Sequence, residues 1–105
     1  MKVYMDDARM TPDGWVRTYT VTETIELLKT RQVTVLSLDN DLGDLDPKTE
    51  GFNVLNFLDE TAYFDETFPI PELFVHSSNE GRAPMMRMVI QKLNEIRMSR
   101  INDVE

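Results

Sequence analysis

The stretch VTVLSLDNDLGD, residues 33–44, decides the fold and raises the question of function. Its first half, VTVLSL, is apolar at most positions, which is typical of a strand that is covered on both faces of a sheet. An acidic loop over residues 39–50 follows, and it begins with four closely spaced carboxylates, those of Asp39, Asp41, Asp44 and Asp46. Like charges this close repel one another, so the loop either exposes them to solvent or holds a cation between them.

Two strands and a helix are predicted before this stretch. KVYM, residues 2–5, is a short apolar run that ends at two aspartates, and the segment 8–14 contains a proline and an Asp-Gly pair, which favour a turn. WVRTYT, residues 15–20, is rich in aromatic and β-branched residues, which indicates a second strand. The run Thr20-Val21-Thr22-Glu23 matches a capping box and predicts a helix that continues to about Thr30.

Two helices and a strand are predicted after it. Residues 51–64 carry a helical stripe of apolar side chains, and ELFVH, residues 72–76, follows two prolines as a fourth strand. From about Asn79 or Arg82 to Met98 the apolar spacing is that of an amphipathic helix. Pro84 must lie in the first turns of this helix to be tolerated.

This order of elements predicts one small α/β domain over residues 1–105. Strands that alternate with helices pair in parallel through right-handed crossovers, and ligands bind outside the carboxyl ends of such strands. The residues that follow the strand ends are Asp6-Asp7, Asp39 and the run His76-Ser77-Ser78-Asn79. Three distant parts of the chain are therefore expected to meet at one edge of the sheet.

Composition limits the classes of function. The chain has 105 residues and a net charge of −8. It has no cysteine, which excludes disulfides, thiolate metal sites and cysteine catalysis. A uniform basic surface for nucleic acid is absent, so an RNA contact must be local or bridged by metal. No apolar run is long enough to span a bilayer, and the first strand leaves no room for a signal peptide, so we expect a cytoplasmic protein without membrane contact.

The pattern at the strand ends resembles the receiver domain of response regulators. More narrowly, the sequence is similar to the cyclic-phosphate-processing receiver family, with matching motifs over nearly the whole chain: VYMDDAR (3–9), DGWVRT (13–18), LSLDNDLG (36–43), GFNVL (51–55) and VHSSNEGR (75–82). The resemblance implies a small receiver-like (flavodoxin-like) parallel sheet of about four strands, in the order 2-1-3-4, in two or three layers.

The departures from a receiver are as informative as the matches. Only residues 8–14 separate the first two strands, where a receiver has a helix, and the chain has neither a fifth strand nor the lysine that ends it. Signalling through phosphorylation is therefore disfavoured. In the cyclic-phosphate-processing family the position between the two aspartates is usually His, whereas here it is Asn40.

The residues and the resemblance together imply a site. Mg²⁺ or Mn²⁺ would be held by Asp6, Asp7 and Asp39, with Asp41 near it, and would polarise a phosphoryl group and help to generate hydroxide. Either that hydroxide or Asp39 would be the nucleophile, and His76 would protonate the leaving alkoxide. The resemblance implies a cyclic phosphate as ligand, either an RNA 2′,3′-cyclic end or a cyclic nucleotide. Its predicted contacts are Asn40, Ser77, Ser78, Asn79 and Arg82.

Simpler interpretations of these residues stay open. His76 also suits a structural role, Ser77, Ser78 and Asn79 also suit a helix cap, and Arg82 also suits the surface. A non-catalytic module that binds a phosphorylated ligand or a protein is the first alternative function, favoured by Asn40, and a degenerate phosphoacceptor receiver is the second. An EF-hand over residues 39–50 is excluded, because its glycine stands one place early and a strand precedes it.

The missing first helix and fifth strand predict one incompletely covered face of the sheet, unless the helix from about Arg82 to Met98 crosses it, and strand alternation is consistent with this. Lys2, Tyr4, Arg17 and Tyr19 can all point to one side, whereas Val3, Met5, Val16 and Thr18 point to the other. Tyrosines interleaved with basic residues suit an interface, and in an acidic protein they suit a negatively charged partner. The expected consequence is a homodimer or a docking surface on that face.

Overall fold

The computed structural model describes residues 1–6, 10–38, 52–75 and 83–102. Within them the chain forms four strands and three helices, in the order β1 (Lys2–Met5), β2 (Val16–Thr18), α1 (Val21–Lys29), β3 (Val35–Leu38), α2 (Phe52–Phe64), β4 (Glu72–Val75) and α3 (Ala83–Asn102). Every element predicted from the sequence is present, and Pro84 lies in the first turn of α3.

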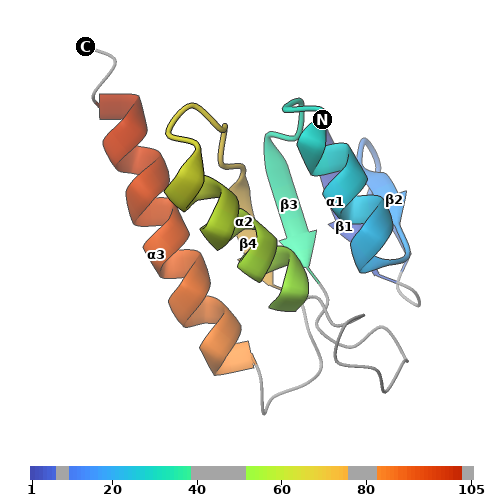
Figure 1. Ribbon diagram of the computed structural model, residues 1–105. Coiled ribbons are helices and arrows are strands. Elements are labelled where there is room, and N and C mark those ends of the chain that lie inside the picture. The colour runs from blue at the N-terminus through green and yellow to red at the C-terminus, as the bar shows by residue number, and fades with distance from the viewer. Residues whose placement is uncertain (7–9, 39–51, 76–82, 103–105) are drawn as a thin grey trace.

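The strands form one parallel sheet in the order β2-β1-β3-β4, which confirms the predicted topology. Figure 1 shows that the three helices begin at the edge where the strands end. Residues 10–15 contain no helix, and no fifth strand follows α3 in the part of the chain described here. The fold is that of a truncated receiver.

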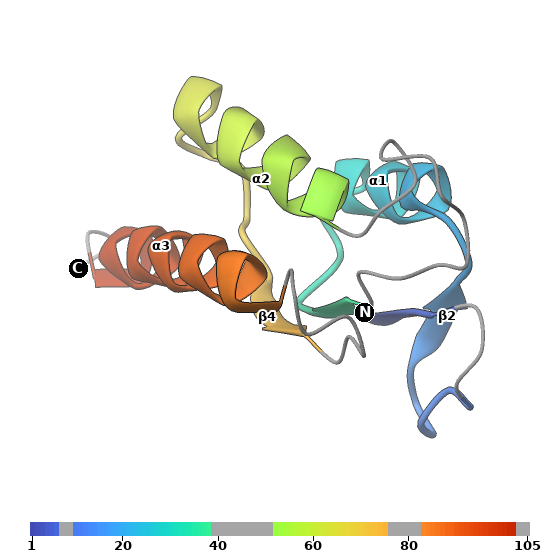
Figure 2. The same ribbon diagram turned by 90° about the horizontal axis from the view of Figure 1, so that it is seen from below.

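The described elements form two layers. Figure 2 shows α1 and α2 on one face of the sheet and α3 beside the edge strand β4, with no described helix on the opposite face. The strand β3 is nevertheless buried on both faces as predicted, since Leu36, Ser37 and Leu38 are 0%, 7% and 0% exposed. The core lies between the sheet and the helices, and its fully buried side chains include Val3, Met5, Leu28, Leu36, Leu38, Val54, Leu55, Leu58, Met86 and Leu93.

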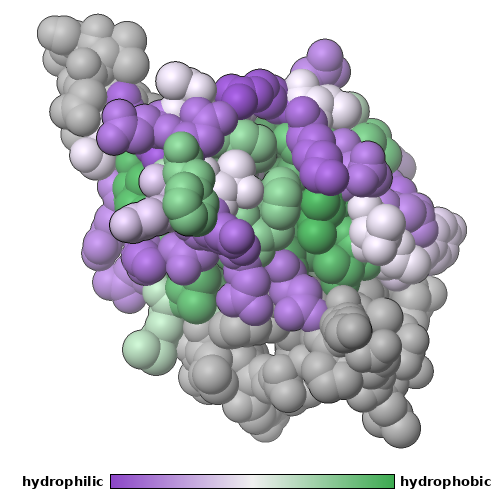
Figure 3. Space-filling view, viewed as in Figure 1, coloured by the Kyte–Doolittle hydropathy of each residue, from purple (hydrophilic) through white to green (hydrophobic). Residues whose placement is uncertain are grey.

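The side chains of β1 and β2 alternate as predicted. Val3 and Met5 are buried under the helices, and Thr18, which pairs with Met5, is buried with them. Lys2 is exposed and Tyr4 is partly exposed, and Arg17 pairs with Tyr4 on the same side of the sheet. Seen from the helical side, hydrophobic surface is visible between α1 and α2, over β3 (Figure 3).

Threonine side chains fix the start of α1. The Thr20 hydroxyl accepts a hydrogen bond from the Glu23 amide at 3.1 Å, which confirms the predicted cap. One turn later the Thr24 hydroxyl donates to the Thr20 carbonyl at 2.9 Å and lies 2.7 Å from the hydroxyl of Thr18. Since Thr18 is the last residue of β2, this chain of hydroxyls joins the first turn of α1 to the carboxyl end of that strand.

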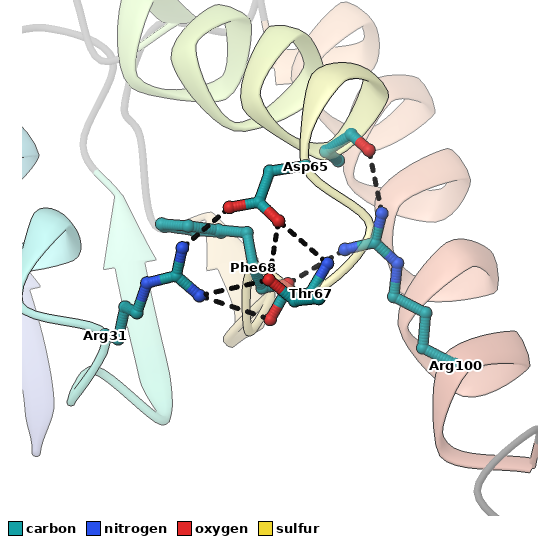
Figure 4. A network of polar contacts seen from close by, with 6 residues as sticks. Arg31, Asp65, Thr67, Phe68 and Arg100 are labelled. Carbon is teal, nitrogen blue, oxygen red and sulfur yellow. Dashed lines mark hydrogen bonds and ion pairs between the residues drawn. The ribbon is translucent and has the colours of Figure 1, made fainter.

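At the other end of the sheet, away from the carboxyl ends of the strands, a polar network joins the residues after α1, the turn between α2 and β4, and the end of α3 (Figure 4). Asp65, which follows α2, accepts hydrogen bonds from the amide and the hydroxyl of Thr67 and forms an ion pair of 2.6 Å with Arg31. From α3, Arg100 donates to the carbonyls of Ala62 and Phe68 at 2.7 and 2.8 Å. These bonds fix the turn between α2 and β4 from both sides.

The last helix is longer than predicted. The sequence predicts its end at Met98, whereas α3 continues to Asn102. Arg100 accounts for the difference, because its two bonds to the α2–β4 turn hold the last turns of the helix in place. Between α3 and β4 lies a groove of about 990 Å³, lined mainly by Leu73, Phe74, Val75, Ile90, Asn94 and Met98.

Candidate functional site

The carboxyl ends of the strands define the candidate site. Met5 pairs with Thr18 and with Leu38, and Leu38 pairs with Val75, so the four strands end in one row across the sheet. The residues that come next in the chain after Met5, Leu38 and Val75 are Asp6, Asp39 and His76. The predicted convergence of the strand ends is therefore confirmed for the strands themselves.

Asp6 is the predicted site residue that the structure describes. It is fully buried, with 0% of its surface exposed. Its amide donates to the Thr18 carbonyl at 3.1 Å, and its own carbonyl accepts from Nε of Arg17 at 2.9 Å. The main chain at Asp6 is thus held from β2 by two hydrogen bonds, which fix the point where the chain leaves β1.

Asp6 fits the predicted role of a metal ligand. Carboxylate oxygens are the ligands that Mg²⁺ and Mn²⁺ prefer, and a fixed main chain limits the positions that the side chain can take. Within the described residues, no three acidic or histidine side chains gather into a group that could hold a metal. Asp6 alone therefore does not make a metal site, and the predicted set of ligands also includes Asp7, Asp39 and Asp41.

The other predicted site residues lie outside the described part of the chain, and their roles stay predictions. The predicted metal ligands in this group are Asp7, Asp39 and Asp41, and the predicted catalytic and phosphate-binding residues are Asn40, His76, Ser77, Ser78, Asn79 and Arg82. The segment of Asp7 lies between β1 and β2 in the chain, that of Asp39 to Asp41 between β3 and α2, and that of His76 to Arg82 between β4 and α3.

The starts of α2 and α3 add to the electrostatics of this edge. Both helices begin where the strands end (Figure 1), at Phe52 and at Ala83. The unpaired amides at the start of a helix carry a partial positive charge, which favours a bound anion. A phosphoryl group and a divalent cation can therefore both find partners of opposite charge at this edge.

Arg17 is a residue that sequence reasoning did not assign to the site. It was predicted to lie on the incompletely covered face, and its partly buried guanidinium in fact reaches the carbonyl of Asp6. The signal in the sequence is indirect. Arg17 precedes by one residue the end of β2, and its partner in β1, Tyr4, lies two residues before Asp6.

None of the described helices has the length and apolar character of a membrane span. No curated protein and no solved structure matches the chain significantly. The family model of the cyclic-phosphate processing receiver domain, in contrast, matches residues 1–92, which is most of the chain. Together with the truncated receiver topology and the aligned strand ends, this match shows that the chain belongs to the cyclic-phosphate processing receiver family.

Proposed function

We propose that the protein binds a cyclic phosphate at the carboxyl edge of its sheet and hydrolyses it in the presence of a divalent metal. The observation that carries the proposal is the alignment of Met5, Leu38 and Val75 in one row, directly before Asp6, Asp39 and His76. The family supports a cyclic phosphate as the ligand, either an RNA 2′,3′-cyclic end or a cyclic nucleotide.

The acidic residues supply the metal-binding part of this site. Asp6, Asp7 and Asp39, with Asp41, would hold Mg²⁺ or Mn²⁺, which would neutralise and polarise the phosphoryl group. Asp6 is suited to this role by its position, because two hydrogen bonds from β2 fix its main chain at the end of β1.

The remaining residues would bind the phosphate and transfer protons. Opening the ring breaks one bond between phosphorus and a ribose oxygen and forms one bond to a water oxygen, either directly or after attack by Asp39. His76 would give a proton to the ribose oxygen that leaves. Asn40, Ser77, Ser78, Asn79 and Arg82 would donate hydrogen bonds to the phosphate oxygens, on which negative charge accumulates.

The test is incubation with a 2′,3′-cyclic nucleotide and Mn²⁺, with the product separated by chromatography. Turnover to the monophosphate supports the enzyme, and His76→Ala should lower the rate by about 10²–10⁴-fold while binding persists. If His76→Ala unfolds the chain, the circular dichroism spectrum will reveal it, and His76→Gln then replaces it. A rate in the folded variant equal to that of the wild type would contradict the proposed acid.

A non-catalytic binding module is the second candidate, and Asn40 is the feature that favours it. Saturable binding of the cyclic nucleotide without turnover would support the module. Asn40→His then becomes informative, because it restores the residue usual in the family and should produce turnover if the missing imidazole is the cause. Labelling of Asp39 by acetyl phosphate would instead support a phosphoacceptor receiver.

A further inference from the structure

The face of the sheet opposite α1 and α2 carries a cluster of aromatic and basic side chains on β1, on β2 and on the two residues that flank β2. We call it the aromatic–basic face and define it by Lys2, Tyr4, Trp15, Arg17 and Tyr19. No described helix covers this side of the sheet (Figure 2). Tyr19 is 51% exposed, and Trp15 and Tyr4 are partly exposed. The rings are therefore accessible on one strand, β1, and on the residues directly before and after β2.

The side chains of this face contact one another. The rings of Tyr4 and Trp15 pack edge to face, with centroids 6.0 Å apart. Nζ of Lys2 lies 5.8 Å from the centre of the Trp15 ring, and the guanidinium of Arg17 lies 4.8 Å from the centre of the Tyr19 ring. Each cation thus lies beside an aromatic ring, an arrangement that presents a flat apolar surface and a positive charge together.

The charge of this face is opposite to that of the molecule. The chain has 19 acidic and 11 basic residues, yet β1 and β2 contain no acidic residue and carry both Lys2 and Arg17. A local positive charge on a protein of net charge −8 favours an anionic partner. Aromatic rings interleaved with cations are the means by which proteins bind single-stranded nucleic acid, since bases stack on the rings and phosphates pair with the cations.

The face also leads to the candidate site. Tyr19 follows Thr18, whose carbonyl accepts a hydrogen bond from the amide of Asp6. Arg17 donates a hydrogen bond to the carbonyl of Asp6. From Lys2 to Met5 the strand rises about 10 Å, enough for a short single strand to lie along it. We propose that the aromatic–basic face binds the single-stranded RNA that leads to a cyclic phosphate end held at the carboxyl edge. This inference rests on the proposed function and names RNA as the substrate class.

The experiment compares two probes by fluorescence anisotropy and by competition. One is a short labelled oligoribonucleotide that ends in a 2′,3′-cyclic phosphate, and the other is a 2′,3′-cyclic mononucleotide. The oligonucleotide should bind at least about tenfold more tightly. Two cations of the face that pair with phosphates should make the slope of log affinity against log salt about 1.4 steeper for the oligonucleotide than for the mononucleotide, and Lys2→Gln should halve that difference.

The variants separate the face from the site. Trp15→Ala and Tyr19→Ala should each lower the affinity for the oligonucleotide by about tenfold and leave the affinity for the mononucleotide unchanged. Tyr63→Ala is the matched control, because Tyr63 is an exposed tyrosine on α2, at 81% exposure, away from this face. Tyr19→Ala removes an exposed ring, so it serves if Trp15→Ala disturbs the fold.

Three outcomes would overturn the inference. The first is equal affinity of the wild type for the two probes. The second is a Tyr19→Ala variant whose affinity falls equally for both probes. The third is light scattering at about twice the chain mass of 12.2 kDa that Tyr19→Ala returns to monomer, which would assign the face to a second copy of the chain. Absence of mononucleotide binding would count against the proposed function alone, provided that the oligonucleotide still binds through Trp15 and Tyr19.

Discussion

At the scale of single residues, Asp65 shows how one carboxylate can join two segments, its own α2–β4 turn and the residue Arg31 that follows α1. Arg31 adopts a positive φ of 64°, a conformation that costs about 1–2 kcal/mol for a residue with a side chain. Its guanidinium pairs with Asp65 and lies 5.5 Å from the centre of the Phe68 ring. The contacts of Arg31 with the α2–β4 turn offset the unfavourable backbone, so the end of α1 depends on a residue that follows α2.

The hydrogen bonds and the ion pair of Asp65 also predict how the stability of the folded chain depends on pH in acid. The hydroxyl of Thr67, then its amide and then Arg31 lower the pKa of Asp65 from 3.8 to about 2. A lowered pKa in the folded state means that the stabilisation is complete above about 3.8 and is lost as the pH falls towards 2. Asp65→Asn should therefore lower the melting temperature at neutral pH, and the difference from wild type should shrink below pH 3.8. Glu66→Gln is the control, and a difference that is constant with pH would contradict the assignment.

A second residue-scale prediction concerns the proposed metal ligands. A metal bound only by the folded state raises stability by mass action, by about 2.7 kcal/mol at one hundred times its dissociation constant. Mg²⁺ or Mn²⁺ should therefore raise the melting temperature of the wild type, and Asp39→Asn should remove most of that rise. Asp13→Asn is the matched control, because Asp13 is exposed in the turn before β2. An unchanged metal response in Asp39→Asn would refute the proposed ligand set.

At the scale of elements, the cap of α1 predicts a measurable loss of stability. The Thr20 hydroxyl satisfies the Glu23 amide, which has no partner inside the helix. Thr20→Ala should lower the free energy of unfolding by about 1 kcal/mol, measured by urea denaturation. Thr22→Ala, an exposed threonine in the same turn, should cost much less. Equal losses in the two variants would show that helix propensity, and not the cap, determines the effect.

The elements also show which features a sequence can predict. The cap at Thr20, the strand at Lys2–Met5 and the order of the sheet follow from local patterns, and the structure confirms them. The sequence predicts the second strand over residues 15–20, whereas β2 spans Val16–Thr18, because among the described strands this edge strand pairs with the short β1 alone. The end of α3 depends on bonds from Arg100 to carbonyls more than thirty positions away, for which the sequence has no local signal.

The same distinction applies to the candidate site. The positions of Asp6, Asp39 and His76 after strand ends could be predicted, since a change from apolar to polar residues marks where a strand stops. The hydrogen bond from Arg17 to Asp6 could not, because it depends on which residue of β2 faces which residue of β1. The mutual geometry of the predicted acidic ligands could not be predicted either, because Asp39 and Asp41 stand more than thirty positions from Asp6 in the chain.

At the scale of the whole molecule, the helices of the two-layer arrangement differ in how many other elements they contact. In the described part of the chain, α1 contacts β1, β2 and α2, whereas α3 contacts only α2 and β4. Helix α3 therefore joins the rest of the molecule at one side of the sheet. The side chains that hold it there include Met86 and Leu93, which are fully buried, and Ile90, which is nearly so.

This one-sided attachment predicts how the molecule unfolds. Leu93→Ala removes a fully buried side chain and should cost about 2–5 kcal/mol, a large part of the 5–15 kcal/mol typical of a domain. Met88→Ala, on the same helix but 71% exposed, should change stability by less than about 0.5 kcal/mol. Urea denaturation followed by circular dichroism reports the helices, and the fluorescence of Trp15 reports the far side of the sheet. In Leu93→Ala the circular dichroism transition should precede the fluorescence transition, because α3 has no described contact with β1 or β2. Coincident transitions at a common lower midpoint would show instead that α3 and the sheet unfold as one cooperative unit.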